Sequence, residues 1–137
     1  LARMVVRDGE GATRLVAVTV RGARSAMDAK RVVNAVMTSP LVKTALYGAE
    51  PNWGRIMAAA GRSGAAVAPE RMAITIAGIP VVAQGGGVAE AQPAAAEAMK
   101  AATYEIVIDL GLGDASATGW TCDLNEGYVK INAGYMT

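Results

Sequence analysis

Glu10 stands between Gly9 and Gly11 in a loop at residues 7–13 that mixes charged side chains with glycine. Glycine lets the backbone form turns that other residues avoid, and it allows a ligand to approach closely. A carboxylate held on such a turn can attract the ammonium group of a small molecule. The alternative is a turn that enters a strand, with Glu10 exposed to water. The loop by itself leaves both interpretations open.

The end of the chain carries polar groups that suit an amino-acid ligand. Asn132 offers both a hydrogen-bond donor and an acceptor, and Thr137 offers a hydroxyl group beside the terminal carboxylate. Together these groups can bind the α-ammonium and α-carboxylate of an amino acid. The alternative, which the residues alone favour, is a C-terminal helix that packs against the domain.

The tetrapeptide Asn-Trp-Gly-Arg at residues 52–55 is a third candidate site. Gly54 lets a backbone or ligand come near, and the planar guanidinium group of Arg55 suits a carboxylate. The alternative is the start of a helix, in which Trp53 packs and Arg55 pairs with Glu50 or with another subunit. We favour the helix start, because the residues assign the motif no direct contact with a ligand.

Two glycine-rich segments resemble phosphate loops but lack their defining residues. Residues 111–116 have neither the third glycine of a dinucleotide fingerprint nor the Lys-Ser/Thr of a P-loop. We interpret them as a turn between strands in which Asp114 bonds its own backbone. The glycines at 85–87 are interpreted as a flexible turn. Cys122, beside Trp120, is expected to be a small buried apolar residue, since burial raises the pKa of a thiol.

Composition narrows the possible functions. At 137 residues the chain is expected to form a single domain over residues 1–137. Its net charge of +1, with mixed signs, indicates neither a nucleic-acid nor a membrane surface. No membrane-spanning apolar run or signal peptide is expected. The single cysteine excludes an internal disulfide and fits a reducing cytoplasm. With no histidine, Asp8, Glu10 and Asp123 are not expected to hold a metal.

Apolar periodicity and turn residues predict the elements that position these side chains. Strands are expected at residues 15–20, 103–110 and 116–124, the last two as neighbours. Residues 72–77 and 79–83 are expected to form a pair of strands or one bent strand. Helices are expected from Ser25 to Ser39, at 40–47, from an Asn52 cap to Gly61 or Gly64, at 93–101 and at 125–134. The fold class is therefore α+β, with helices packed on a mostly antiparallel or mixed sheet.

Five sequence blocks, in this order along the chain, resemble the ornithine acetyltransferases, or bifunctional glutamate N-acetyltransferases, of arginine biosynthesis. They are MVVRDGEGAT (4–13), SPLVKTA (39–45), PNWGRI (51–56), GDASAT with WTCDL (113–118 and 120–124) and YVKINA (128–133). The blocks span nearly the whole chain. We therefore identify the sequence as similar to the C-terminal part of a β chain of this family.

The resemblance implies an architecture and a reaction. The family has an α/β sandwich like that of N-terminal-nucleophile hydrolases, and its precursor cuts itself before a threonine to give α and β chains. That threonine carries an acetyl group from N-acetylornithine to glutamate. The implied partners are the α chain and the remainder of the β chain, in a heterotetramer or larger assembly. No cofactor is implied, although bifunctional members accept acetyl-CoA.

Residue by residue, the family's substrate contacts match three positions of this chain: Glu10, Asn132 and Thr137. No catalytic residue is assigned, because the nucleophilic threonine and its cleavage site have no counterpart in the sequence. We expect the chain to be inactive alone. The departures from the family pattern are Leu112, Gly134 and Met136. They leave open an alternative, a stand-alone domain that binds an amino acid or a partner.

Overall fold

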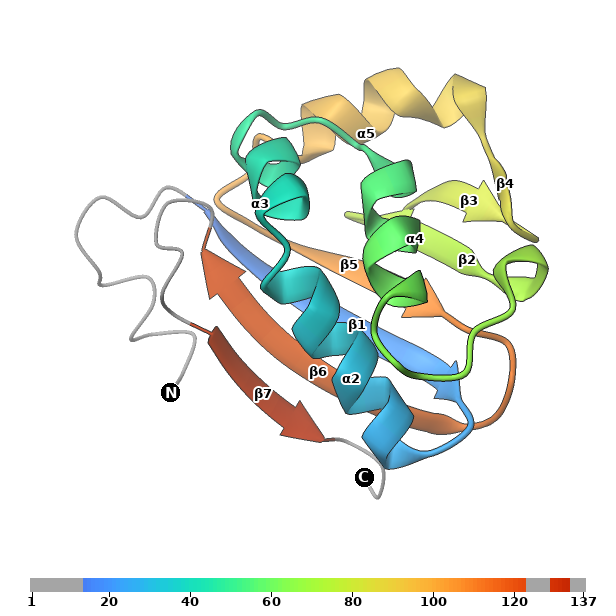
Figure 1. Cartoon of the computed structure of the whole chain (residues 1–137). Helices are drawn as coiled ribbons and strands as arrows, with labels where there is room; N and C mark the ends of the chain where they lie inside the picture. Colours follow the sequence, from blue (N-terminus) through green and yellow to red (C-terminus); the bar gives the residue numbers. More distant parts are fainter. Residues whose placement is uncertain (1–13, 123–128, 134–137) are drawn as a thin grey trace.

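The structure, a computed structural model, describes residues 14–122 and 129–133, which form helices on one seven-stranded sheet (Figure 1). The strands are β1 (Leu15–Ala23), β2 (Ala73–Ile76), β3 (Ile79–Ala83), β4 (Gly86–Gly87), β5 (Thr103–Asp109), β6 (Ala115–Cys122) and β7 (Val129–Ala133). The α-helices are α2 (Ala26–Met37), α3 (Pro40–Tyr47), α4 (Trp53–Gly61) and α5 (Gln92–Ala98). Short 3-10 helices cover Pro69–Arg71 and Ala89–Ala91. The predicted α+β class is confirmed.

The sheet is mixed, with strand order β4-β3-β2-β5-β1-β6-β7. Its central pair, β1 and β5, is parallel, and the other neighbours are antiparallel. Parallel neighbours need a long crossover connection, and the chain between β1 and β5 supplies one that contains all four helices. These helices therefore gather on one side, with α2, α3 and α4 in front of the sheet in Figure 1 and α5 along its top.

Alternation along the central strands separates a covered face from an uncovered one. On β1, Val16, Val18 and Val20 are buried beneath the helices, and Ile106 and Ile108 of β5 join them in the core. The intervening positions, on the opposite face, are half-buried or exposed. Period-2 alternation of this kind is typical of a sheet packed on one side. Among the described residues no helix or strand covers the other side, which is called the uncovered face.

The predicted helix starts are confirmed by their capping hydrogen bonds. The Ser25 hydroxyl accepts from the Asp28 amide at 3.1 Å, and the Asn52 side chain accepts from the Arg55 amide at 3.2 Å. Ser39 caps α3 in the same way, with Pro40 in the first turn. Capping satisfies amides that lack a partner within the helix, so these boundaries follow from local chemistry. The alanine-rich helix α5 ends at Ala98, slightly before the expected end.

The predicted pair of strands at residues 72–83 is a hairpin between β2 and β3. Its turn, Ala77-Gly78, has φ angles of 53° and 81°, and the next turn, Gln84-Gly85, has 49° and 78°. Two successive positive φ angles are the geometry of a type I′ hairpin turn. The expectation of a flexible turn at residues 85–87 is wrong in part, because two of its glycines form β4 and pair with β3.

The expected pairing of the strand at 116–124 with the preceding strand is wrong. The strand β6 pairs with β1 instead, so β1 lies between β5 and β6. The loop after β5 passes the end of β1, where the amides of Leu112 and Gly113 donate to the carbonyl of Gly22 at 2.8 Å. The side chain that bonds the backbone in this loop is that of Asp109, which accepts from the Gly111 amide at 3.0 Å, and not that of Asp114 as predicted.

The expected C-terminal helix at residues 125–134 is also wrong. Residues 129–133 form β7, antiparallel to β6 at the edge of the sheet. The segment Val-Lys-Ile-Asn-Ala alternates apolar and polar residues, which suits a strand with one face against the core. A free edge on β6 supplies the backbone partners, and this long-range pairing outweighs local helix propensity.

Candidate functional site

The structure describes one of the three predicted substrate contacts. Glu10 and Thr137 lie outside the described residues, as do Asp8 and Asp123 of the metal alternative. Asn132 lies in β7, at the register position opposite Thr118 of β6. The strand places Asn132 at the edge of the sheet, beside a polar part of the uncovered face.

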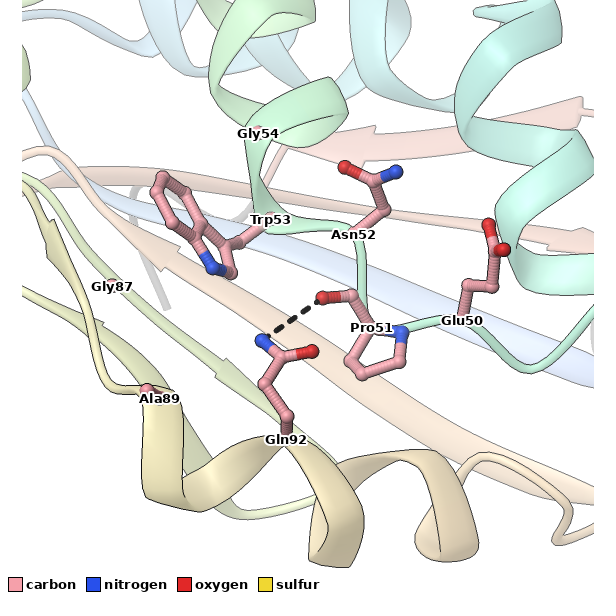
Figure 2. Close-up of a pocket in the computed structure, with 8 residues that line it drawn as sticks. All are labelled: Glu50, Pro51, Asn52, Trp53, Gly54, Gly87, Ala89 and Gln92. Atoms are coloured by element: carbon pink, nitrogen blue, oxygen red, sulfur yellow. Dashed lines mark hydrogen bonds between the residues drawn. The ribbon is translucent and has the colours of Figure 1, made fainter.

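A pocket of about 640 Å³ opens at the start of α4, where the third candidate motif lies (Figure 2). Five parts of the chain form it: the link between α3 and α4, the start of α4, the strand β4, the 3-10 helix at Ala89–Ala91 and the start of α5. Its lining residues are Glu50, Pro51, Asn52, Trp53, Gly54, Gly87, Ala89 and Gln92. Three residues of the tetrapeptide, Asn52, Trp53 and Gly54, thus line a cavity, and Arg55 is not among its lining residues.

Hydrogen bonds orient two of the polar side chains of this pocket, Asn52 and Gln92. Asn52 caps α4, so its side-chain oxygen is committed to the helix. The Gln92 side-chain amide donates to the carbonyl of Pro51 at 3.5 Å, which joins α5 to the α3–α4 link (Figure 2). A bond of this length is weak. The pocket walls are therefore joined by a contact that a ligand can displace.

Close backbone approach occurs at Gly87 and not at Gly54, the glycine that the sequence singled out. A β-carbon on Gly87 would meet Trp53 Cζ2, and would lie 2.7 Å from Cε2 and 3.0 Å from Nε1 of the same indole. On Gly54 a β-carbon would meet only the Asn52 side-chain oxygen, at 3.5 Å, an ordinary contact. The indole of Trp53 therefore rests on β4 because position 87 has no side chain.

Of the two partners predicted for Arg55, Glu50 is wrong within the described structure, and another subunit stays a prediction. The Arg55 guanidinium donates to the Leu41 carbonyl at 2.9 Å instead. That carbonyl belongs to α3, so Arg55 ties the start of α4 to the neighbouring helix. The helix-start interpretation of the motif is confirmed, since Trp53 packs against the core and Asn52 caps the helix.

The pocket at α4 is equipped for binding more than for bond breaking. Its eight lining residues include no serine, threonine, cysteine, histidine or lysine. Its polar groups are the Glu50 carboxylate, the amides of Asn52 and Gln92, and backbone groups, beside the apolar indole of Trp53. Concave, mostly apolar sites with a few polar groups are typical of small-molecule pockets.

A second cavity, of about 410 Å³, lies on the uncovered face of the sheet. It is lined by residues of β1, β5 and β6: Leu15, Ala17, Thr19, Thr103, Tyr104, Glu105, Thr118 and Trp120. Thr118 stands in register between Thr19 and Asn132, so this cavity adjoins the predicted substrate contact. Sequence reasoning missed it. The available signal was polar residues at alternate positions of predicted strands, whose pairing the sequence left open.

Within the part of the chain that it describes, the structure tests two further possibilities, a metal site and a membrane-spanning helix. There, no three His, Cys, Asp or Glu side chains are grouped so as to hold a metal ion. Every helix described is too short or too polar to cross a lipid bilayer. Cys122 ends β6, but its side chain is outside the description, so its predicted burial stays a prediction.

Comparisons with known proteins agree with the sequence blocks. The family model described as "ArgJ family" matches residues 1–137. The chain is 52% identical to the arginine biosynthesis bifunctional protein ArgJ of Syntrophotalea carbinolica, and 47% identical to the glutamate N-acetyltransferase of Methanopyrus kandleri. Each alignment covers 100% of this chain, and it covers 35% and 36% of the two relatives. The chain thus spans about a third of the length of these relatives.

A solved structure supports the same assignment. The crystal structure of the arginine biosynthesis bifunctional protein ArgJ of Bacillus halodurans matches with a TM-score of 0.83 and 39% identity. The match covers 90% of this chain and 58% of that one. Since the family model spans the chain from end to end, the chain belongs to the ArgJ family of arginine biosynthesis.

Proposed function

We propose that this chain is the C-terminal part of the β chain of an acetyltransferase that moves an acetyl group from N-acetylornithine to glutamate. The observation that carries the proposal is the family match over all 137 residues. One relative is named as a bifunctional protein of arginine biosynthesis and another as a glutamate N-acetyltransferase. The chain supplies about a third of such a protein. Its role is to contact substrate and to pack against the rest of the enzyme.

The proposed reaction passes through an acetyl-threonine intermediate. A threonine at the start of the β chain, outside these residues, attacks the acetyl group of N-acetylornithine, and ornithine leaves. Glutamate then takes the acetyl group from the threonine. The free amine of an N-terminal threonine can serve as its own base, which suits a chain without histidine.

Within that reaction the chain orients the substrates and breaks no bond. Glu10 attracts an ammonium group, while Asn132 and Thr137 bind the polar ends of the amino acid. Holding a substrate in the attack geometry lowers the entropic part of the barrier. The position of Asn132 in β7, in register with Thr118 of the uncovered face, supports this role.

The proposed partners are the α chain and the remainder of the β chain. Exposed apolar side chains on the helical side support such packing: Leu41 is 55% exposed and Tyr47 is 58% exposed on α3, and Met27 is 60% exposed on α2. Burial of these side chains would each contribute about 1–3 kcal/mol to association before its costs. An assembly would also bring the threonine nucleophile to the substrate contacts.

Acetyl transfer measured on the chain alone and on the reconstituted complex tests the proposal. We expect transfer from N-acetylornithine to glutamate by the complex and none by the isolated chain. Turnover by the isolated chain, or a complete complex without transfer, would refute it. Tight binding of ornithine or N-acetylornithine by the chain, with an inactive complex, would instead support a stand-alone binding domain. Substituting acetyl-CoA for N-acetylornithine in the same assay tests whether the enzyme is bifunctional.

A further inference from the structure

Three side chains on the uncovered face form a row with a fixed direction of hydrogen bonding. The Thr19 hydroxyl donates to Glu105 Oε2 at 2.7 Å, and its oxygen lies 3.0 Å from the Thr118 hydroxyl oxygen. An ionised carboxylate only accepts hydrogen bonds, and a hydroxyl has a single proton to give. Thr19 therefore uses its proton on Glu105, and Thr118 must donate to Thr19. The row therefore ends in oxygens that can still accept a hydrogen bond, on Glu105 at one end and on Thr118 at the other, and its hydroxyl protons are already used.

The cavity around this row combines acceptors with an apolar wall. Glu105 is exposed, so its second carboxylate oxygen remains open to a ligand. Ala17 and Trp120 lie opposite each other on β1 and β6, at the same level as Glu105. A row of acceptors beside an indole suits a cation, which gains hydrogen bonds from the acceptors and attraction to the ring. The apolar residues suit a hydrocarbon stem that leads to the cation.

The location of the cavity connects it with the proposed substrate. Thr19, Thr118 and Asn132 occupy one register level on β1, β6 and β7. Two strand spacings, about 10 Å, separate Thr19 from Asn132. In N-acetylornithine the α-amine is acylated, so the distal amine is its one free cation, at the end of three methylene groups. A substrate held by its α-substituents at Asn132 can extend this amine along the row.

We propose that Glu105, Thr19 and Thr118 form a subsite for the distal primary ammonium group of an N-acylated diamino acid, with its methylene chain against Trp120. This inference rests on the proposed function, because that function supplies the ligand. It adds Glu105 to Glu10 as a carboxylate that attracts the side-chain amine, which distinguishes the acetyl donor from acceptors that lack it.

Lys130 occupies the register position opposite Trp120, so competition by this lysine for the subsite is tested as well. A lysine bound to Glu105 would exclude the ligand. The variant Lys130→Met removes this competitor. We expect it to leave the affinity for N-acetylornithine unchanged or tighter, and a loss of affinity would count against the subsite.

Titration by nuclear magnetic resonance tests the proposal on the 137-residue chain. The chain has two tryptophans, and only Trp120 lines this cavity, while Trp53 lines the pocket at α4. The probe is N-acetylornithine, compared with N-acetylnorvaline, which has the same stem without the amine. We expect the indole signal of Trp120 to shift and that of Trp53 to stay, with binding of the norvaline compound about tenfold or more weaker.

Substitutions test whether the Glu105 carboxylate causes the preference for N-acetylornithine over N-acetylnorvaline. Glu105→Gln should weaken N-acetylornithine about tenfold and leave N-acetylnorvaline unchanged, and Thr118→Val should weaken the former as well. The matched control is Glu97→Gln, which removes an exposed carboxylate on α5 and should change neither affinity. Thermal unfolding of each variant shows whether the fold is retained. Equal affinity for the two ligands, no saturable binding, or a shift confined to Trp53 would overturn the proposal.

Kinetics of the complete complex separate this inference from the proposed function. If the complex transfers acetyl groups but Glu105→Gln leaves KM for N-acetylornithine unchanged, the subsite is refuted and the function stands. If the wild-type complex transfers none, the function is refuted, and the two-ligand comparison on the chain still decides the subsite. A raised KM with unchanged kcat supports both.

Discussion

Gly87 allows the Trp53 indole to rest on β4, and Gly87→Ala tests how much this contact matters. The added β-carbon would lie 2.7 Å from Cε2 of the indole, closer than real β-carbons approach other atoms, and 3.0 Å from Nε1. The ring or the strand must therefore move. Trp53 packs against the core and its neighbour Asn52 caps α4, so movement disturbs the start of that helix. Overpacking of this kind costs about 1–3 kcal/mol.

Gly86→Ala is a matched control, because it adds the same methyl group in the same short strand. Its β-carbon would meet only the Ala83 carbonyl, at 3.7 Å, an ordinary contact. Neither glycine has the left-handed φ that strains other residues. Differences in backbone conformation therefore do not account for any difference between the two variants. Substitution at Gly86 should change stability by less than about 0.5 kcal/mol.

Urea unfolding of both variants, followed by tryptophan fluorescence, measures the difference. In a Trp120→Phe background Trp53 is the one remaining tryptophan, so its emission reports the displaced ring directly. We expect Gly87→Ala to lower the free energy of unfolding by about 1–3 kcal/mol, and the melting temperature by about 3–10 °C. Equal stability of the two variants, with unchanged emission from Trp53, would refute the reasoning.

Four further substitutions test other parts of the structure and the proposed site. In the complete enzyme, Glu10→Ala should raise KM for N-acetylornithine more than it lowers kcat, and steady-state kinetics with an unchanged KM would exclude a binding role. Ile106→Ala should cost about 2–5 kcal/mol in urea unfolding because the side chain is fully buried, whereas half-buried Val107→Ala should cost clearly less. Ser25→Ala should cost about 1 kcal/mol by removing the cap of α2, and Ser25→Asp, which can still cap, should restore most of it. Ala77→Asn should stabilise the β2–β3 hairpin by about 0.5–1 kcal/mol, since Asn tolerates the positive φ of this turn; a lower melting temperature would contradict this.

The helix starts were predictable because their chemistry is local. Ser25, Ser39 and Asn52 each accept a hydrogen bond from an amide three residues later, so cap and helix lie together in the sequence. Alternating apolar residues likewise predicted which side of β5 is buried, with Ile106 and Ile108 in the core. In both cases the interacting groups are neighbours in the chain, and their spacing alone fixes the geometry.

Strand neighbours and close contacts were not predictable in the same way. The pairing of β6 with β1 joins residues about a hundred positions apart, such as Thr19 and Thr118. The strand β7 forms because β6 offers it an edge for backbone pairing. The local sequence of residues 129–133 is also compatible with a helix. The local sequence around Gly87 predicts a turn, and the contact that requires a glycine there comes from Trp53, far earlier in the chain.

The sequence by itself determined the family, the α+β class and three substrate contacts to test: Glu10, Asn132 and Thr137. Only the tertiary structure decided which polar groups stand beside Asn132, because backbone pairing between distant strands brings Glu105, Thr19 and Thr118 into one row. Composition and periodicity specify which face of a strand is apolar. They do not specify which strand lies next to it, since every strand offers the same backbone donors and acceptors.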